Sequence, residues 1–461
     1  MTTRPVFRTA IRIAALDALE VLDSRGNPTV QATVTLADGT QGSAAVPSGA
    51  STGAFEAHEL RDGDPARYRG RGVRRAVEHV RGPIAARLQG ADPRDQAGID
   101  RALIELDGTP NKSRLGANAL LAASLACAHA AAAAEREPLF RWLARLAGSV
   151  PRLPLPMINL LSGGKHAGGQ VDFQDFLIVP RGARSVAQAL EMTHAVYFAA
   201  LDGLRERHSY QPLVADEGGL APRLSSNEAM LEECVTAIER AGLRPLEDVA
   251  LAIDVAATHL FHAGAPGAAA GSRSGAVGSA AGGGRYRLAV EHAELDGAAL
   301  VERLAGWRRK YPLLSIEDGL AEDDWAHWPS LTARLGAECQ VLGDDLFVTQ
   351  TARMARGVRE RAANSVLIKV NQAGTLSEAL AALRLARESG WTAVVSARSG
   401  ETEDAWLADL ATGSGAGQIK VGSIARSERL AKYNRLLLLE HRFPELDFAR
   451  DALDRFMGRP T

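Results

Sequence analysis

Apolar and polar positions along the chain follow two different periods, and the change of period predicts two domains. Residues 14–46 alternate apolar and polar positions, with turn-forming sequences at Ser24-Arg25-Gly26-Asn27-Pro28 and Ala37-Asp38-Gly39. This pattern is typical of a short antiparallel meander. Helical periodicity follows from about residue 73 to about residue 147. Strands followed by helices predict an N-terminal α+β domain over residues 1–150.

Residues 150–156 contain three spaced prolines, which indicates a linker at the end of this domain. A different pattern begins there. Apolar runs of strand length alternate with helical stretches. From Glu317 onward, the charged ends of successive runs are roughly 22 to 29 residues apart, the length of one strand-plus-helix unit. The runs are residues 249–254, 313–318, 340–345, 365–369, 393–398 and 417–420. This repetition predicts an α/β fold over residues 151–461, a closed β/α barrel whose strand ends converge on one mouth.

Three segments depart from these patterns. Residues 117–134 are apolar over the length of a membrane span, but they are mostly alanine and include Asn118 and Ser124, so we expect a buried helix. Residues 263–284 consist almost wholly of Gly, Ala and Ser, which predicts a flexible, exposed insert without chemistry. Residues 47–53 are small and polar, as in a mobile lid that brings amides and hydroxyls to a ligand. A plain surface loop is an equal alternative for residues 47–53.

Composition narrows the classes of partner. The 461 residues carry 53 Lys and Arg against 55 Asp and Glu, so no overall field predicts binding to nucleic acid or to an anionic membrane. Cys127, Cys234 and Cys339 are widely separated, which predicts three free thiols rather than a disulfide framework. The N-terminal residues lack the long apolar core of a secretory signal, and we therefore expect a cytoplasmic protein.

Lys369 ends the apolar run of residues 365–368. A lone lysine at a strand end is more often a surface residue whose stem lies along apolar neighbours. In a barrel, however, this end of the strand lies at the mouth where active sites form. Desolvation beside other cations can lower the pKa of a lysine enough to make it a base near neutral pH. The residues at the other strand ends indicate whether Lys369 is a surface lysine or a base.

Three further strand ends carry carboxylates: Asp254, Glu317 and Asp344. Hard oxygen donors without accompanying Cys or His favour Mg2+ over zinc. The alternative pairs each carboxylate with a buried cation, for which the chain offers Lys369, Arg398 and Lys420. The same three cations are equally suited to an anionic substrate. A divalent cation, an anionic substrate and a strand-end lysine together fit removal of a proton next to a carboxylate.

Motifs along almost the whole chain resemble the enolase family, the phosphopyruvate hydratases. They occupy residues 22–28, 46–53, 111–118, 216–219, 315–318 and 399–404. The resemblance implies an N-terminal α+β lid domain, an enolase-type TIM-like barrel with one antiparallel strand pair, and a homodimer or higher oligomer. It also implies a small phosphorylated substrate. The enolase superfamily is a known example of a lysine base that works with one or two Mg2+ ions.

Residue by residue, the resemblance implies a complete site. Asp254, Glu317 and Asp344 would bind the first Mg2+, and Ser51 would meet a second one. Lys369 would take the proton from carbon 2 of 2-phosphoglycerate, and Glu217 would protonate the hydroxyl that leaves carbon 3. The substrate itself would contact Lys420 through its carboxylate and Arg398 and Ser399 through its phosphate, with His166, Gln174 and Asp175 at further pocket positions. A carboxyl that must stay protonated needs burial, so we expect an upward-shifted pKa for Glu217.

Two positions depart from the family pattern. Enolases carry a histidine immediately before the phosphate-binding arginine, where this chain has Ala397, and a glutamate where it has Asp175. Both changes concern the side of the pocket from which the leaving group departs. They leave three hypotheses: an ordinary enolase; a specialised relative of phosphonate biosynthesis, such as carboxyphosphonoenolpyruvate synthase, that uses a 2-phosphoglycerate-type substrate; and a catalytically dead scaffold. The complete set of metal ligands and base argues against the scaffold.

Overall fold

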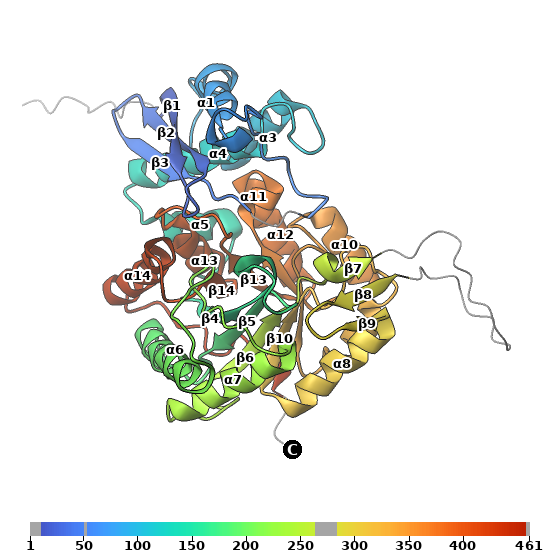
Figure 1. The fold of residues 1–461 in the computed structure, drawn as a ribbon. Helices are drawn as coiled ribbons and strands as arrows, with labels where there is room; N and C mark the ends of the chain where they lie inside the picture. The colour runs from blue at the N-terminus through green and yellow to red at the C-terminus, as the bar shows by residue number, and fades with distance from the viewer. Residues whose placement is uncertain (1–10, 50–52, 263–283, 458–461) are drawn as a thin grey trace, which may run out of the picture.

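The computed structural model describes residues 11–49, 53–262 and 284–457 (Figure 1). The predicted metal ligand Ser51 lies outside the described residues. So does all of the predicted insert except Gly284. Of the predicted lid, residues 47–49 and Gly53 are described.

The N-terminal part is a small antiparallel sheet covered by helices, as predicted. Strands β1 (Ile13–Leu22), β2 (Pro28–Leu36) and β3 (Gln41–Ala45) follow one another in the sheet. Their apolar positions alternate with polar ones, and β2 buries Val30, Ala32 and Val34. The helices that follow are α1 (Arg74–His79), a π-helical turn η2 (Val80–Ile84), α2 (Ala85–Leu88), α3 (Gln96–Asp107), α4 (Ala117–Ala134) and α5 (Leu139–Ala147).

Helix α4 packs directly on this sheet. A Cβ placed on Gly42 of β3 would lie 2.0 Å from the backbone nitrogen of Ala130 and 2.6 Å from the carbonyl oxygen of Ala126. Only small residues allow two backbones to approach so closely, which explains the alanine content of α4. Among the described residues, α4 is the one helix long and apolar enough to cross a membrane, and 83% of it is buried. It is therefore a core helix, as predicted.

The second part is a closed eight-stranded barrel in the order β10-β11-β12-β13-β14-β4-β5-β6. The strands are β4 (Leu155–Ser162), β5 (Asp175–Val179), β6 (Ala250–Asp254), β10 (Leu313–Glu317), β11 (Gln340–Gly343), β12 (Ser365–Ile368), β13 (Thr392–Ser396) and β14 (Gly417–Gly422). Strand β5 runs antiparallel to both β4 and β6. The expected single antiparallel pair is therefore two pairs, because one reversed strand has two neighbours. The predicted fold class is confirmed.

Helices surround the barrel, and a small sheet lies at its edge (Figure 1). The helices are α6 (Val186–His208), α7 (Asn227–Arg240), α8 (Gly297–Lys310), α9 (Trp328–Leu335), α10 (Thr351–Glu360), α11 (Val370–Ala373), α12 (Leu376–Glu388), α13 (Trp406–Ser414) and α14 (Ser427–Arg442). The small sheet consists of β7 (Phe261–His262), β8 (Arg285–Leu288) and β9 (Ala293–Leu295). Inward-facing apolar residues of the barrel strands form a core with Leu453 and Phe456 of the C-terminal segment. Cys127, Cys234 and Cys339 are buried and free, as predicted.

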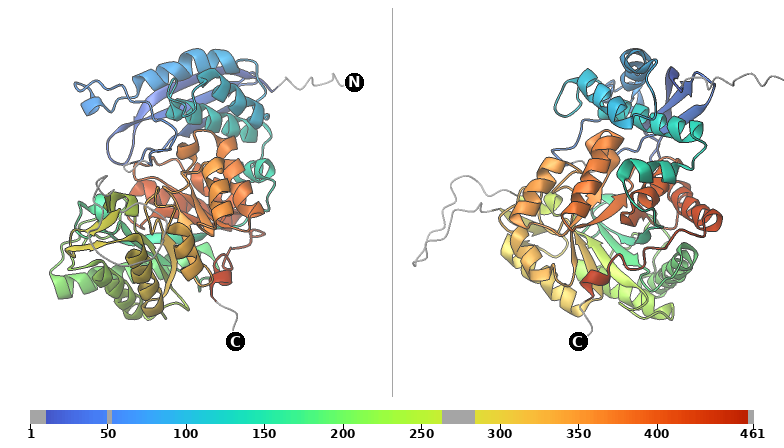
Figure 2. Two further views of the ribbon diagram at one scale, coloured as in Figure 1. Left: turned by 90° about the vertical axis from the view of Figure 1, so that its right-hand side faces the viewer. Right: turned by 180° about the vertical axis from the view of Figure 1, so that it is seen from behind.

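The N-terminal sheet and its helices lie on one side of the barrel (Figures 1 and 2). The join is made of backbone hydrogen bonds. The N–H of Ser48 donates to the carbonyl of Gly400 at 2.8 Å, and the N–H of Gly400 donates back at 2.9 Å. The N–H of Ser24 donates to the carbonyl of Glu401 at 2.7 Å. These bonds hold Ser24 and Ser48 of the N-terminal part against the loop that follows β13.

Candidate active site

The carboxyl ends of the barrel strands bring the predicted charged residues together. Asp254 and Glu317 are the last residues of neighbouring strands β6 and β10 and stand side by side in the register. Asp344 follows β11, and Lys369 follows β12. Arg398 lies just after β13, and Lys420 lies within β14. All of these side chains are buried or nearly so. The barrel topology thus makes neighbours of residues far apart in the sequence.

The cations and carboxylates of this cluster pair directly. Lys420 Nζ donates to Asp254 Oδ2 at 3.0 Å and to Glu317 Oε2 at 2.8 Å. Lys369 Nζ donates to Asp344 Oδ2. Burial would lower the pKa of Lys420, but the charges of Asp254 and Glu317 outweigh it and raise that pKa well above its ordinary value. Ion pairing of the carboxylates is the alternative to metal binding that the sequence left open, and these ion pairs are present.

The same carboxylates also fit a divalent cation. Glu317 Oε1 is buried and has no hydrogen-bond partner. Burial, followed by the charge of Asp254, raises the pKa of Glu317 well above its ordinary value. A buried carboxylate oxygen without a donor is costly, and a hard cation would satisfy it. The oxygen donors Asp254, Glu317 and Asp344 are therefore suited to Mg2+.

A second set of carboxylates adjoins Asp344. One oxygen each of Asp318, Asp344 and Asp345 lies within 4.8 Å of the others. Asp318 accepts from the backbone N–H groups of Asp344 and Asp345 at 2.9 and 2.7 Å, so it fixes the turn that follows β11. Burial and the neighbouring charge of Asp344 raise the pKa of Asp345 to about 7. Asp254 and Glu317 do not belong to this second set; both accept hydrogen bonds from Lys420.

His166, Asp175 and Glu217 form a further group of charged side chains beside this cluster. His166 Nδ1 lies 3.0 Å from Asp175 Oδ2, and its Nε2 lies 4.0 Å from Glu217 Oε1. Asn159 and Ser162 donate to the other oxygen of Asp175. Burial alone would lower the pKa of His166, but the charges of Asp175 and Glu217 and the Asp175 hydrogen bond raise it to about 9.

The expected upward shift for Glu217 is wrong for this arrangement. Burial does raise its pKa, but the charges of His166, Arg429 and Lys420 outweigh burial and lower it. The sequence predicted the burial of this carboxyl. It did not predict a protonated imidazole 4.0 Å away. Glu217 therefore gains its proton only if the charge around it changes.

Arg398 is held by a bidentate pair with Glu56, a residue that no sequence pattern singled out. Arg398 Nη1 donates to Glu56 Oε2 at 3.1 Å, and Nη2 donates to Oε1 at 3.2 Å. Nη1 also donates to Asn371 Oδ1 at 2.9 Å. Ser399 Oγ accepts from Arg25 Nη1 at 3.1 Å. A guanidinium fork of this kind suits a phosphate as well as a carboxylate.

One small cavity is lined by residues of the charged cluster and by His166 and Glu217. Its lining consists of His166, Gln174, Glu217, Asp254, Lys369, Ser396, Ala397, Arg398, Ser399 and Lys420. Its volume is about 20 Å³, because the charged side chains contact one another. A ligand and a cation would have to separate these pairs. The predicted residues His166, Gln174, Arg398, Ser399 and Lys420 are thus brought together with the base and acid positions, and Asp175 supports them from behind.

Two family models match the chain. Residues 13–143 match the N-terminal domain of enolase, and residues 151–449 match the C-terminal TIM barrel domain of enolase. The chain belongs to the enolase family. Members of this family use Mg2+ and bind small phosphorylated substrates. The buried acidic residues at the barrel mouth are therefore a possible metal site in an enolase-family barrel.

The two departures from the enolase pattern lie in or beside the cavity. Ala397 lines it, next to Arg398, and is 6% exposed. Asp175 lies behind His166 and is fully buried. The backbone N–H of Ala397 donates to the carbonyl of Lys420 at 2.9 Å, so its Cβ is fixed at the strand end. The differences thus concern the wall near His166 and Glu217, not the carboxylates of β6 and β10.

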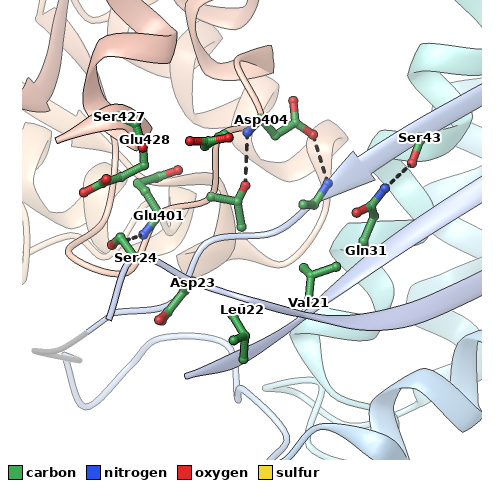
Figure 3. A pocket seen from close by; sticks show the side chains of 13 residues that line it. Val21, Leu22, Asp23, Ser24, Gln31, Ser43, Glu401, Asp404, Ser427 and Glu428 are labelled. Carbon is green, nitrogen blue, oxygen red and sulfur yellow. Dashed lines mark hydrogen bonds between the residues drawn. The ribbon is translucent and has the colours of Figure 1, made fainter. Parts of the chain in front are cut away.

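A larger hollow of about 570 Å³ lies elsewhere, between the N-terminal sheet and the loops after β13 and β14 (Figure 3). Its lining includes Asp23, Glu401, Glu403, Asp404 and Glu428. None of the described residues that line it is a lysine or arginine. Three of these carboxylates pair with cations: Asp23 with Arg25, Glu401 with Lys432 and Glu428 with Arg426. These cations do not line the hollow, so its described lining offers an anionic ligand carboxylates and no cationic partner. This enolase-family chain therefore offers the small cavity at the barrel mouth, rather than the larger hollow, to a phosphorylated substrate.

Sequence reasoning missed two residues that contact the charged cluster, Glu56 and Gln372. Gln372 Nε2 donates to Asp344 Oδ1 at 2.9 Å. Glu56 follows the predicted lid, and Gln372 follows Lys369 by three positions. The one feature of the sequence that could have indicated them is their closeness to the predicted lid and to Lys369. Neither residue ends a strand, so the pattern that located the other residues could not find them.

Proposed function

We propose that the protein is a Mg2+-dependent enolase that converts 2-phosphoglycerate into phosphoenolpyruvate and water. The observation that carries the proposal is that Lys369 and Glu217 line one cavity together with Arg398 and Lys420. A base, an acid and two cations facing one space match a phosphorylated carboxylic acid that loses a proton and a hydroxyl. The buried carboxylates beside them supply oxygen ligands for a cation.

In this proposal Lys369 Nζ takes the proton from carbon 2. The electron pair of that C–H bond forms the carbon–carbon double bond, the C3–O bond breaks, and the hydroxyl leaves as water with a proton from Glu217. When bound, Mg2+ would neutralise the carboxylates and draw charge from the substrate carboxylate. Arg398 and Ser399 bind the phosphate, and Lys420 faces the substrate carboxylate. We assign the first Mg2+ to Asp254, Glu317 and Asp344, and a second one to Ser51.

Lys369 must be neutral to act as a base. Burial would lower its pKa, but the charge of Asp344 outweighs burial and raises it. A cation engaged by Asp344 and Glu317 would offset two of the charges that raise this pKa, while burial and the charge of Arg398 would still lower it. The charge of Asp345 would then be the remaining raising contribution. The same reasoning supports Glu217 as the acid, because a substrate that draws His166 or Lys420 away removes charges that now lower the pKa of Glu217.

Ala397 favours a second candidate, a specialised enolase-like enzyme of the carboxyphosphonoenolpyruvate synthase type. Its small side chain lies in the cavity wall where enolases carry an imidazole, beside the proposed phosphate ligand Arg398. In such an enzyme Lys369 would still remove the proton. The substrate would be of the 2-phosphoglycerate type but would differ in the group that leaves carbon 3. A catalytically dead scaffold is the least supported candidate, because the proposed base and carboxylates are all present.

The test is turnover of 2-phosphoglycerate by purified protein with Mg2+, followed by the ultraviolet absorbance of phosphoenolpyruvate. We expect turnover that requires Mg2+. Binding of 2-phosphoglycerate without turnover would contradict the proposed enolase activity and favour the specialised enzyme. A protein that binds neither Mg2+ nor 2-phosphoglycerate would leave only the scaffold.

We also propose that the protein is a homodimer, as the family resemblance implies. Two exposed leucines of β1 support this proposal, since Leu19 is 46% exposed and Leu22 is 56% exposed. Leu22 also lines the acidic hollow of Figure 3. Exposed apolar surface is a common feature of protein interfaces when it forms a contiguous patch.

A further inference from the structure

Gln372 connects three parts of the site through one fully buried side chain. Its Nε2 donates to Asp344 Oδ1 at 2.9 Å and to Glu56 Oε1 at 3.3 Å. Its Oε1 accepts from the Thr349 hydroxyl at 2.7 Å. Thr349 Oγ1 in turn accepts from the backbone N–H of Lys369 at 2.9 Å. The proposed metal, phosphate and base sides thus meet at one amide.

The chemistry of the partners fixes the orientation of this amide. Ionised carboxylates can only accept hydrogen bonds, so the NH2 group of Gln372 must face Asp344 and Glu56. The Thr349 hydroxyl has one hydrogen, which it donates to the amide oxygen. The same hydroxyl is then an acceptor for the Lys369 N–H. The chain of hydrogen bonds therefore has one consistent direction and leaves the amide no second arrangement.

The Glu56 arm reaches the proposed phosphate ligand. Glu56 Oε1 accepts from Gln372 Nε2, from Arg398 Nη2 and from the backbone N–H of Gly53 at 3.0 Å. The side chains of Glu56 and Arg398 are 7% and 2% exposed. The backbone carbonyl of Gln372 also accepts from the N–H of Ala57 at 2.9 Å. Gln372 therefore holds the N-terminal segment and the guanidinium pair at the same time.

The Thr349 arm shows backbone strain. Val348 and Thr349 have φ angles of 42° and 56°, in the left-handed region that β-branched residues rarely adopt. Such strain persists only where the surrounding structure enforces it, and it is common at functional sites. Here it places the Thr349 hydroxyl between Gln372 and the Lys369 backbone. Val348 and Thr349 lie four and five positions after Asp344, so the proposed metal ligand and the hydroxyl share one short segment.

We propose that Gln372 is a positioning residue that keeps Asp344, the Glu56–Arg398 pair and the Lys369 backbone in mutual register. This role rests on the proposed function, because that function assigns Mg2+ to Asp344 and phosphate to Arg398. Without the amide, two carboxylate oxygens lose a buried donor, and Glu56 and Asp344 repel each other across the space. Outer residues that orient metal ligands in this way commonly set metal affinity.

The test compares Gln372→Met with Gln340→Met. Methionine keeps the length of the side chain and removes both hydrogen-bonding groups. Gln340 is a matched control: it is fully buried at the start of β11, and its Nε2 donates to Thr392 and Gln418 at 2.8 and 2.9 Å. Calorimetry measures binding of Mg2+ alone and of inorganic phosphate with Mg2+ present. Thermal unfolding measures the cost to stability.

We expect Gln372→Met to weaken Mg2+ binding by roughly tenfold to a hundredfold and phosphate binding by about tenfold. Gln340→Met should lose comparable stability and keep both affinities. Unchanged affinities in Gln372→Met would overturn the proposal. So would equal losses in both variants, because these would reflect general destabilisation. A wild-type protein that binds neither probe would overturn it as well.

Gln372→Asn keeps an amide in the space and shortens its reach, so it replaces Gln372→Met if that variant does not fold. The same loss of both affinities is expected. These measurements need no turnover, which separates this role from the proposed reaction. A wild-type protein that binds both probes but does not convert 2-phosphoglycerate would contradict the ordinary enolase activity, while the two variants would still decide the role of Gln372.

Discussion

At the scale of single residues, each buried cation of the site lies against a carboxylate. Lys420 contacts Asp254 and Glu317, and Lys369 contacts Asp344. Removal of one member of such a pair leaves an unbalanced buried charge, which costs more than the pair itself contributes. The site is therefore held together by the same side chains that the proposed reaction uses.

His166 should make the stability of the metal-free protein depend on pH. Its pKa is raised to about 9 in the folded state, above about 6.5 for an unfolded histidine. The folded state therefore binds the proton more tightly. This contribution is fully present below pH about 6.5 and is lost as pH rises through 9. Its upper bound is on the order of 3 kcal/mol.

Urea unfolding of wild-type protein and His166→Gln at pH 6.5 and pH 9.5 measures this contribution. The advantage of the wild type should shrink between the two pH values, because glutamine does not titrate. An advantage that stays constant or grows with pH would show that His166 is not held protonated by Asp175 and Glu217.

Ala397→His tests the leaving-group side. A ring in the cavity wall beside Arg398 would add a polar group near Glu217, so we expect the kcat for phosphoenolpyruvate formation to rise by roughly tenfold or more. The change in KM should be smaller, since the phosphate and carboxylate contacts are retained. Steady-state kinetics measures both constants. An unchanged kcat in a folded variant would mean that Ala397 does not limit the second step.

At the scale of elements, the pattern of the sequence predicted six of the eight barrel strands and the charged residues at or near their ends, but not β4 and β5. Charge at the end of an apolar run is visible in the sequence, because strand and helix periods are local properties. The two antiparallel pairs of β5 were not visible, since strand direction depends on packing between segments. The partners of each lysine were not visible either, because they depend on side-chain conformations in the closed barrel.

Gly42→Ala should destabilise the N-terminal part through the contact of β3 with α4. The added methyl would lie 2.0 Å from the Ala130 nitrogen, so one backbone must move. Overpacking of this kind costs typically about 1–3 kcal/mol, and a backbone clash lies at the upper end. Chemical denaturation measures the loss. Gly82→Ala is the control, because its Cβ meets no atom within 4 Å; a loss equal to that of Gly42→Ala would contradict the packing argument.

At the scale of the whole molecule, the site needs both parts of the chain. Glu56 reaches Arg398 from the N-terminal side, and the Ser48–Gly400 hydrogen bonds hold the loop after β13. These contacts join residues more than 300 positions apart. Local patterns carry no information on such contacts, which is why Glu56 and Gln372 were missed. The motifs of the enolase family placed the N-terminal segment near the site, but not on Arg398.

The proposed homodimer has a direct test. Light scattering coupled to size exclusion should give twice the chain mass of 48.8 kDa. Leu22→Asp should shift the population toward the monomer, because burial of an aspartate in an interface is costly. Leu213→Asp is the matched control, as Leu213 is 65% exposed and belongs to the barrel part. A wild-type mass of one chain would contradict the proposal.

We propose above all that Lys369 removes the proton from carbon 2 with Mg2+ present. Exchange of that hydrogen in heavy water, followed by proton NMR of 2-phosphoglycerate, measures this step without requiring the leaving group to depart. Wild-type protein should exchange the hydrogen in the presence of Mg2+ and not after chelation. Lys369→Ala should exchange it roughly a hundredfold to ten-thousandfold more slowly. Exchange at the wild-type rate in Lys369→Ala, or none in a wild-type protein that binds 2-phosphoglycerate, would contradict the claim.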